Sequence, residues 1–451
     1  MDRLLRDYGM IFVLLGLCII FSVLTLEKQM PDSNRVADQI LEAVGKQNDR
    51  KTHVLTVGSS NKSSSALAKQ LEILLKEEGF NSVRSVVGTP KDLRAVLDEM
   101  QADNNPPHFI VPSQDVAKWR LFEQLLDKYP GLRKTQIVIP ESYLWPIFLK
   151  KSNLLAVVDR IVVIAIMAIG MTMVIITGGI DLSVGSLIAV SAVIGTSIMK
   201  AMGGLEASGS VVLIGFLAGI LFTGLIGAVG GLIVAHFKVP PFITTLGIML
   251  MGRGLAFMIT GGFSIYQVPP ALPWLGQGKT VGIPNTVILL VILYIVAHIF
   301  MSHTRLGRYI YAVGGNEEAA RLSGVSVSFV TTFVFLISGL AAGLGGCIQA
   351  SQLNTGTPNM GVMYELYVIA AVVVGGTSLS GGSGKILGTL IGVFVISVIQ
   401  NGMNLLGLES YTQQVVLGFV ILIAVLLDKA RSGGTFAGVF SRKNIIGKKD
   451  K

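Results

Sequence analysis

The stretch VDRIVVIAIMAIGMTMVIITGGIDLSVGSL, residues 158–187, decides the fold class. Between Arg160 and Asp181 the chain runs for twenty residues without a charge, which is the length that a helix needs to cross the hydrocarbon core of a bilayer. Two glycines, the Asp181 carboxylate and a serine then follow before the apolar character resumes. The chain is therefore expected to cross a membrane here, in a span that is interrupted by a polar turn.

The composition of the whole chain agrees with a membrane protein. Of the 451 residues, 51% are hydrophobic and only 14% are charged, so most of the chain suits lipid better than water. Further apolar runs predict an α-helical polytopic membrane protein with about ten transmembrane helices. The predicted spans lie near 10–26, 158–178, 182–200, 209–236, 242–260, 284–302, 327–350, 366–380, 386–404 and 413–428.

The basic residues predict which ends of these spans face the cytoplasm, because short cytoplasmic loops are enriched in Lys and Arg. With a cytoplasmic N-terminus, the loops on that side receive Lys238, Arg305, Arg308, Arg321, Lys385 and the C-terminal tail. This distribution explains the net charge of +9 without nucleic acid as a partner. The first span lacks a small-x-small cleavage pattern, so we expect it to be retained as a helix.

Residues 30–145 have a different, charged character, and the predicted topology places them outside the cytoplasm. HVLTVGSS (53–60) predicts a strand and SSALAKQLEILLKEEGF (64–80) a helix, and Thr89 is a plausible N-cap of the next helix. Strands and helices alternate up to TQIVIP, with a helix expected at 114–130, which predicts a small Rossmann-like parallel sheet. The expected domains are an N-terminal transmembrane helix (1–29), an extracytoplasmic α/β domain (30–145), a transmembrane permease domain (146–432) and a basic cytoplasmic tail (433–451).

Two spans are broken by related glycine-rich segments, ITGGIDLSVGSL (176–187) and VVGGTSLSGGSG (373–384). Unwound backbone in a membrane needs polar partners that lipid cannot supply, and such breaks in two halves of a transporter point to its pathway. The alternative interpretation is loop glycine at a membrane surface. We expect at least one of the two segments to act in the pathway or its gating.

Three charged residues fall in or beside apolar spans, where an unsatisfied charge is costly. Asp181 either has a functional role or serves as the N-cap of a helix starting at Leu182. Glu365 and Arg253 must likewise be satisfied within the bundle, by pairing with each other or with Asp181 among other ways. The candidate pathway residues are Gly178, Gly179, Asp181, Ser183, Arg253, Glu365, Gly375, Gly376 and Asn404.

Motifs for enzymatic chemistry are absent from the sequence. SGGSGKI (380–386) resembles a phosphate-binding loop only superficially, because Leu379 replaces the required first glycine and Ile386 replaces the Ser or Thr that would bind magnesium. The two cysteines, Cys18 and Cys347, have no metal-ligand spacing. We therefore expect no cofactor, no metal and no catalytic residue, and an energy source on another polypeptide.

The loop TRLGRYIYAVGGNEEAARLSGVSV (304–327) is amphipathic around NEEAARLSG. A short helix here would suit docking of a partner, with Ala319, Ala320 and Leu322 available for contact. The alternative is a solvated helix that only connects two spans.

Five segments together resemble the ribose-type sugar permeases of bacterial ABC importers. These segments are AIMAIGMTMVIITGGIDLSVGSL (165–187), PPFITTLGIMLMGRGLAF (240–257), GRYIYAVGGNEEAARLSGVSV (307–327), YELYVIAAVVVGGTSLSGG (364–382) and QNGMNLLGLESYTQQVVLG (400–418). The resemblance covers roughly residues 145–430 and the first helix. It implies a homodimer of permeases, two ATPase subunits docked on cytoplasmic loops, and an extracytoplasmic binding protein that delivers ribose or a related monosaccharide.

The resemblance also implies that the NEEAARLSG loop couples ATP binding to transport. Its residues are Gly315, Asn316, Glu317, Glu318, Ala319, Ala320, Arg321, Leu322, Ser323 and Gly324. Two departures stand out, namely the roughly 110 extra residues after the first helix and Tyr367, where the family generally has an acidic residue. The extra domain resembles half of a sugar-binding protein, so it either captures ligand or serves docking or structure. A membrane-anchored ligand sensor and an ATP-independent secondary transporter remain as competing interpretations.

Overall fold

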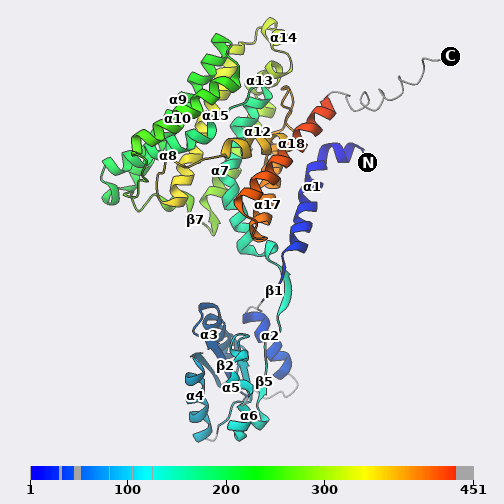
Figure 1. The fold of residues 1–451 in the computed structure, drawn as a ribbon, viewed down its shortest axis with the longest axis vertical. Coiled ribbons are helices and arrows are strands. Elements are labelled where there is room, and N and C mark those ends of the chain that lie inside the picture. Colours follow the sequence, from blue (N-terminus) through cyan, green and yellow to red (C-terminus); the bar gives the residue numbers. More distant parts are fainter. Residues whose placement is uncertain are drawn as a thin grey trace, which may run out of the picture. The chain divides into compact units, whose positions relative to one another are not determined.

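The computed structural model describes residues 2–29, 33–44, 52–80, 82–103, 105–123 and 125–432 (Figure 1). The chain divides into two compact units. Leu26–Pro146 form an α/β unit, and Met1–Thr25 together with Ile147–Lys451 form a helical unit. The basic tail expected at 433–451 lies outside the described residues.

The α/β unit contains the predicted parallel sheet. Its four strands lie in the order β3-β2-β4-β5, and every neighbouring pair is parallel. Successive side chains of β2 point to opposite faces, so Val54 packs with the α3 side and Leu55 with the α4 side. The elements are β2 (His53–Ser59), α3 (Lys62–Glu77), β3 (Ser82–Gly88), α4 (Pro90–Ala102), β4 (Phe109–Pro112) and β5 (Gln136–Ile137), preceded by α2 (Ser33–Val44).

Two features of this unit differ from the sequence interpretation or were missed by it. The helix expected at 114–130 begins later than predicted, at Arg120, because Asp115 is held in a turn by hydrogen bonds from Ser59 and Ser113. The described elements of this stretch are η1 (Val116–Lys118), α5 (Arg120–Glu123), α6 (Leu125–Lys128) and η2 (Pro130–Lys134). In addition, β1 (Leu26–Gln29) pairs antiparallel with β6 (Tyr143–Pro146), where the chain enters and leaves the unit. By contrast, the Thr89 N-cap is confirmed, and its backbone N–H donates to Asp92 Oδ2 over 2.8 Å.

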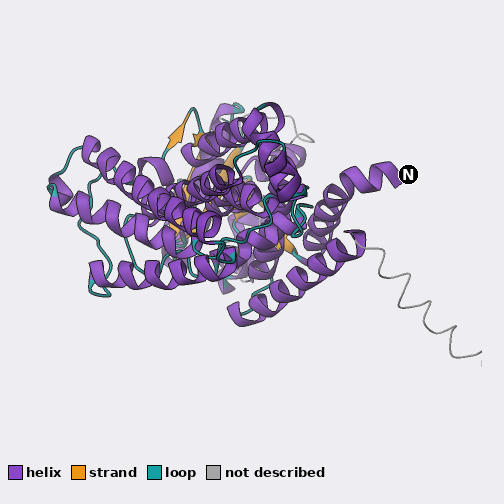
Figure 2. Ribbon diagram, turned by 90° about the horizontal axis from the view of Figure 1, so that it is seen from above, coloured by secondary structure: helices purple, strands orange, loops and turns teal. Residues whose placement is uncertain are grey.

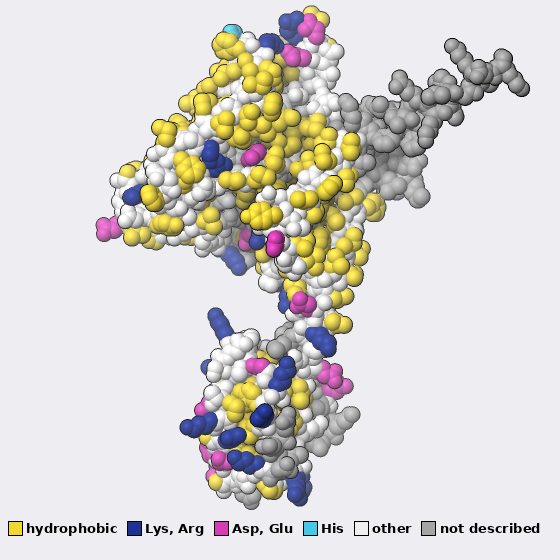
Figure 3. Space-filling view, viewed as in Figure 1, with side chains coloured by type: hydrophobic (Ala, Val, Ile, Leu, Met, Phe, Trp, Pro, Cys, Tyr) yellow, Lys and Arg dark blue, Asp and Glu magenta, His cyan; other side chains and the backbone are white. Residues whose placement is uncertain are grey.

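The helical unit has an apolar helix at each predicted span, and Figure 2 shows the helices in a second view, turned by 90° from Figure 1. Among the described residues, seven helices are long and apolar enough to cross a membrane. They are α7 (Lys151–Ile176), α8 (Val184–Ala201), α9 (Gly209–Phe237), α10 (Pro241–Thr260), α12 (Asn285–His303), α15 (Val327–Leu353) and α17 (Ile386–Leu405). The visible flank of the unit is covered largely by hydrophobic side chains, as a lipid-facing surface requires (Figure 3).

Three further apolar helices are shorter. They belong to α1 (Asp2–Leu24), α16 (Tyr364–Val374) and α18 (Ser410–Ser432). The span predicted at 366–380 is wrong in its length, since α16 has 11 residues and extends only about 16 Å, half of a hydrocarbon core. Gly375 and Gly376 end it, and an irregular segment, residues 354–363, precedes it.

Candidate functional site

Two helices begin side by side inside the helical unit. Gly185 lies in the first turn of α8, and the space that a side chain would fill there is occupied by the Glu365 carboxylate and the Gly361 carbonyl. Glu365 itself belongs to the first turn of α16. Helix N-termini carry partial positive charge, so a carboxylate that touches two of them is stabilised. This arrangement gives the candidate residue Glu365 a physical reason for its position.

The irregular segment 354–363 follows α8 into the bundle. Gly356 packs against Thr196, and Gly361 packs against Gly185 and Ile188. Thr196 and Gly185 are eleven positions apart in α8, so the segment descends about 16 Å along that helix. Its backbone has left the helical hydrogen-bond pattern and therefore needs other partners at this depth.

Arg253 of α10 supplies two of those partners. Its Nη1 donates to the carbonyl oxygens of Pro358 and Met360 over 2.8 and 2.7 Å. In the described part of the chain, no salt bridge joins Arg253, Glu365 or Asp181, so the pairing considered from the sequence is not formed. Arg253 instead holds the irregular backbone, and its charge attracts Glu365 at longer range.

Asp181 is fixed by hydrogen bonds between the first glycine break and α15. Its Oδ1 accepts from the backbone N–H and the hydroxyl of Ser183 over 2.9 and 2.6 Å, and its Oδ2 accepts from Ser338 Oγ over 2.7 Å. Because α8 starts at Val184, the interpretation of Asp181 as N-cap of a helix at Leu182 is wrong. With 1% of its surface exposed, Asp181 ties the turn before α8 to α15 in this conformation.

The two glycine-rich segments meet each other, and a third joins them. The Gly382 N–H donates to the Ile176 carbonyl over 2.8 Å, and the Tyr311 hydroxyl donates to the Gly384 carbonyl over 2.8 Å. Gly314, in α13 (Arg305–Gly315), packs against both Ile176 and Gly382, where a Cβ would collide with backbone. The sequence interpretation paired the first two segments but missed Gly314, although its GG doublet resembles theirs.

The remaining candidates are not all brought together. Gly178 and Gly376 have positive φ angles of 82° and 88° and open space beside them. Gly375 packs against Gly388 near the start of α17, and Gly179 packs against Val174. Asn404 lies at the opposite end of α17, exposed, and accepts a hydrogen bond from Gln413 over 2.8 Å. Asn404 is therefore remote from the glycine breaks.

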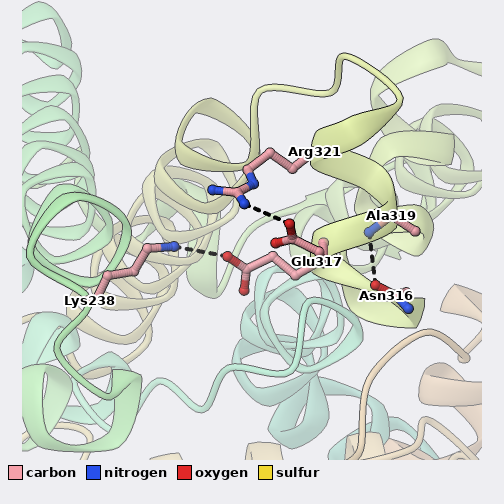
Figure 4. A network of polar contacts seen from close by, with 6 residues as sticks. Lys238, Asn316, Glu317, Ala319 and Arg321 are labelled. Carbon is pink, nitrogen blue, oxygen red and sulfur yellow. Dashed lines mark hydrogen bonds and ion pairs between the residues drawn. The ribbon is translucent and has the colours of Figure 1, made fainter.

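The predicted amphipathic loop forms a short helix, α14 (Glu317–Leu322), with Asn316 as its N-cap (Figure 4). Asn316 Oδ1 accepts from the Ala319 N–H over 2.9 Å. Leu322 is 79% exposed, whereas Ala320 is buried against the bundle. The expectation that Ala320 is available for docking is therefore wrong. Its side chain packs into the core of the bundle and holds α14 there.

Two ion pairs order this loop, and one of them reaches another element. Glu318 pairs with Arg321 within α14 over 2.6 Å, and Glu317 pairs with Lys238 over 2.9 Å (Figure 4). Lys238 is the left-handed C-cap of α9, at the turn into α10. A cavity of about 250 Å³ lies beside this pair, and its lining includes Gly178 and Gly179. The loop helix, the α9–α10 turn and the first glycine break are thereby neighbours.

Comparisons with known proteins agree on the family. A family profile described as "Branched-chain amino acid transport system / permease component" matches residues 153–425. The chain is 44% identical to the ribose import permease protein RbsC of Escherichia coli (strain K12) over 325 residues, 71% of this chain and 99% of that protein. It is 41% identical to the ribose import permease protein RbsC of Bacillus subtilis (strain 168), over 69% of this chain and 95% of the relative.

A third relative carries another sugar in its name. The D-allose transport system permease protein AlsC of Escherichia coli (strain K12) is 36% identical over 62% of this chain and 85% of its own length. No solved structure matches. The profile match over residues 153–425 and the near-complete coverage of these relatives make the chain a member of the branched-chain amino acid transport system / permease component family.

Proposed function

We propose that this chain is the membrane-spanning permease subunit of an ABC importer and moves a ribose-like monosaccharide into the cell. The relatives named above are ribose import permeases and a D-allose permease, and the chain spans nearly the whole of the first. The energy comes from a separate ATPase subunit, and an extracytoplasmic binding protein delivers the sugar. Two copies of the chain form the complete permease in the inner membrane.

The proposal rests on the place where two interrupted helices, α8 and α16, begin beside each other. In transporters, discontinuous helices place half-helix N-termini at the substrate pathway. Here α8 and α16 begin beside each other with Glu365 between them, and Arg253 holds the irregular segment that leads into α16. Glu365 and Arg253 thus border the pathway. Asp181 and Ser183 position α8, and Gly178, Gly179, Gly375 and Gly376 form the hinges of the two breaks.

The coupling site is the α13–α14 hairpin together with the α9–α10 turn. Leu322 and the charged face of α14 meet the ATPase, and Ala320 fixes α14 to the bundle. Gly314 at the end of α13 touches both glycine-rich breaks, so a displacement of the hairpin reaches them directly. ATP binding in the partner then shifts the population between inward-open and outward-open forms through these contacts.

The α/β unit lies outside the cytoplasm. With the N-terminus inside, α1 crosses once before residue 26, and the basic loops around Lys238, Arg305 and Arg308 then fall on the cytoplasmic side. The domain organisation proposed from the sequence, with residues 30–145 outside and 433–451 inside, follows from the same count. In that position the unit is placed to meet the binding protein or its ligand.

The test is uptake of labelled monosaccharides, ribose foremost, into proteoliposomes that contain the chain, its ATPase and its binding protein. Uptake that requires ATP and is lost when Leu322 is replaced by Glu supports the importer and its coupling helix. Uptake without ATP that collapses with the proton gradient would instead indicate a secondary transporter. Absence of uptake, together with ligand binding to the extracytoplasmic part of the chain, would indicate a sensor.

A further inference from the structure

Four neutral polar side chains gather between α15, α16 and α17. The Gln349 amide donates to the Tyr364 hydroxyl over 3.1 Å, and Tyr367 is hydrogen-bonded to Gln400. The two tyrosine rings lie 6.2 Å apart between centroids. We call Gln349, Tyr364, Tyr367 and Gln400 the amide–tyrosine cluster. Such a set of groups is unusual in an apolar bundle, where every polar group must find a partner.

One buried polar atom of the cluster has no hydrogen-bond partner among the described residues. The side-chain carbonyl oxygen of Gln349 is buried and accepts no hydrogen bond from the described part of the chain. A buried acceptor without a donor costs free energy, and such groups in native proteins call for an explanation. A ligand hydroxyl that donates to this oxygen would supply one.

An open cavity lies about one helical turn along α15 from Gln349. It has a volume of about 450 Å³, and its lining includes Asp159, Arg160, Gln277 and Gln352. That volume falls in the range of small-molecule pockets, roughly 300–1,000 Å³. Gln352 follows Gln349 by three positions on α15, so the two side chains are neighbours on one face of the helix.

The position of the cavity fits the entrance of the pathway. It lies where α7 begins and α15 ends, which is the extracytoplasmic end in the proposed topology. The cluster then continues into α16, whose first turn holds Glu365 between the two helix starts. Gln352 at the cavity, the amide–tyrosine cluster and Glu365 therefore follow one another along α15 and α16.

We propose that the amide–tyrosine cluster is a binding site for a neutral polyhydroxyl ligand, entered from this cavity. The inference rests on the proposed function and names the residues that first contact the sugar. Amide and phenol groups both donate and accept, so they match hydroxyls, which do the same. The Gln349 carbonyl oxygen accepts from one ligand hydroxyl, and the tyrosine rings contact its carbon-bound hydrogens.

The experiment compares ATP-driven uptake of ribose and of its 2-deoxy analogue by the complete importer in proteoliposomes. The variants are Gln349→Leu, Tyr364→Phe and Gln400→Leu, and Gln414→Leu serves as control because Gln414 is an exposed glutamine on α18, outside the cluster. We expect each cluster variant to raise KM for ribose about tenfold, with a smaller effect on kcat. At least one cluster variant should also reduce the preference for ribose over the deoxy sugar, which a purely structural role would not do.

Tyr364→Phe removes a single oxygen atom and keeps the ring, so it tests the site even if the glutamine variants do not fold. KM values and sugar preference within twofold of the parent in a folded, transporting Tyr364→Phe variant would overturn the proposal. Failure of the unsubstituted importer to take up any sugar would be a different result. It would overturn the proposed function, and this inference with it.

Discussion

Replacing Arg253 by Met tests whether this side chain holds the irregular segment 354–363 in place. Methionine keeps the apolar stem but removes both hydrogen bonds to the carbonyls of Pro358 and Met360. Hydrogen bonds to charged groups contribute about 1.5–3 kcal/mol each, so the two together amount to about 3–6 kcal/mol. Polar contacts measured between helices inside membranes are weaker, on average about 0.6 kcal/mol and at most about 1.7 kcal/mol each. We therefore expect a loss of about 1–3 kcal/mol in the free energy of unfolding.

The assay is reversible unfolding of the purified chain in mixed micelles, followed by helix content. Arg253→Lys should be intermediate, because a lysine retains the charge but not the fixed fork of donors. Arg308→Met is the matched control, since Arg308 also donates to a carbonyl, that of His303 over 3.4 Å, but is exposed. A change below about 0.5 kcal/mol in Arg253→Met, similar to that of the control, would refute the supporting role.

Three further predictions concern other contacts. Gly314→Ala should cost about 1–3 kcal/mol of unfolding free energy, because its Cβ would collide with backbone, whereas Gly315→Ala, with nothing within 4 Å, should cost little in the same titration. Lys238→Glu should lower sugar transported per ATP hydrolysed while changing stability by less than about 1 kcal/mol, and adding Glu317→Lys should restore the ratio. Burial alone would raise the pKa of Asp115, but hydrogen bonds from neighbouring serines outweigh it and lower the pKa. The stabilisation by this carboxylate is therefore present above its unfolded pKa of about 3.9 and lost as the pH falls below it, so hydrogen-exchange protection of β2 should decline there in the parent and not in Asp115→Asn.

Local patterns in the sequence predicted most elements correctly, because each depends on neighbours along the chain. The apolar runs became helices, and the alternation between 53 and 137 became a parallel sheet. The length of α16 was predicted less well. The predicted span ran past the Gly375–Gly376 doublet to 380, whereas the helix ends before this doublet, where Gly375 packs against Gly388 of α17.

The contacts that define the candidate site depend on residues far apart in the sequence. Arg253 was identified as a charge that needs a partner, but its partners are carbonyl oxygens, which carry no signal in residue type. Asp181 finds Ser338, 157 positions away, and such a serine looks like any other in an apolar helix. Sequence reasoning therefore found the residues that need explanation, and only the fold shows what satisfies them.

Because β1 and β6 pair with each other, the α/β unit between them is a segment of the chain that can be removed as a whole. Leu26 pairs with Pro146 and Gln29 with Tyr143, so the chain leaves and returns through adjacent strands in a fixed register. In effect the unit is the loop of a β-hairpin, with a whole sheet in place of a turn. Joining Gln29 to Tyr143 through Asn-Gly, which favours a tight two-residue turn, would give a shortened chain whose strand pairing is preserved. The same junction could accept a foreign reporter domain, which makes this ribbon a natural grafting point for engineering.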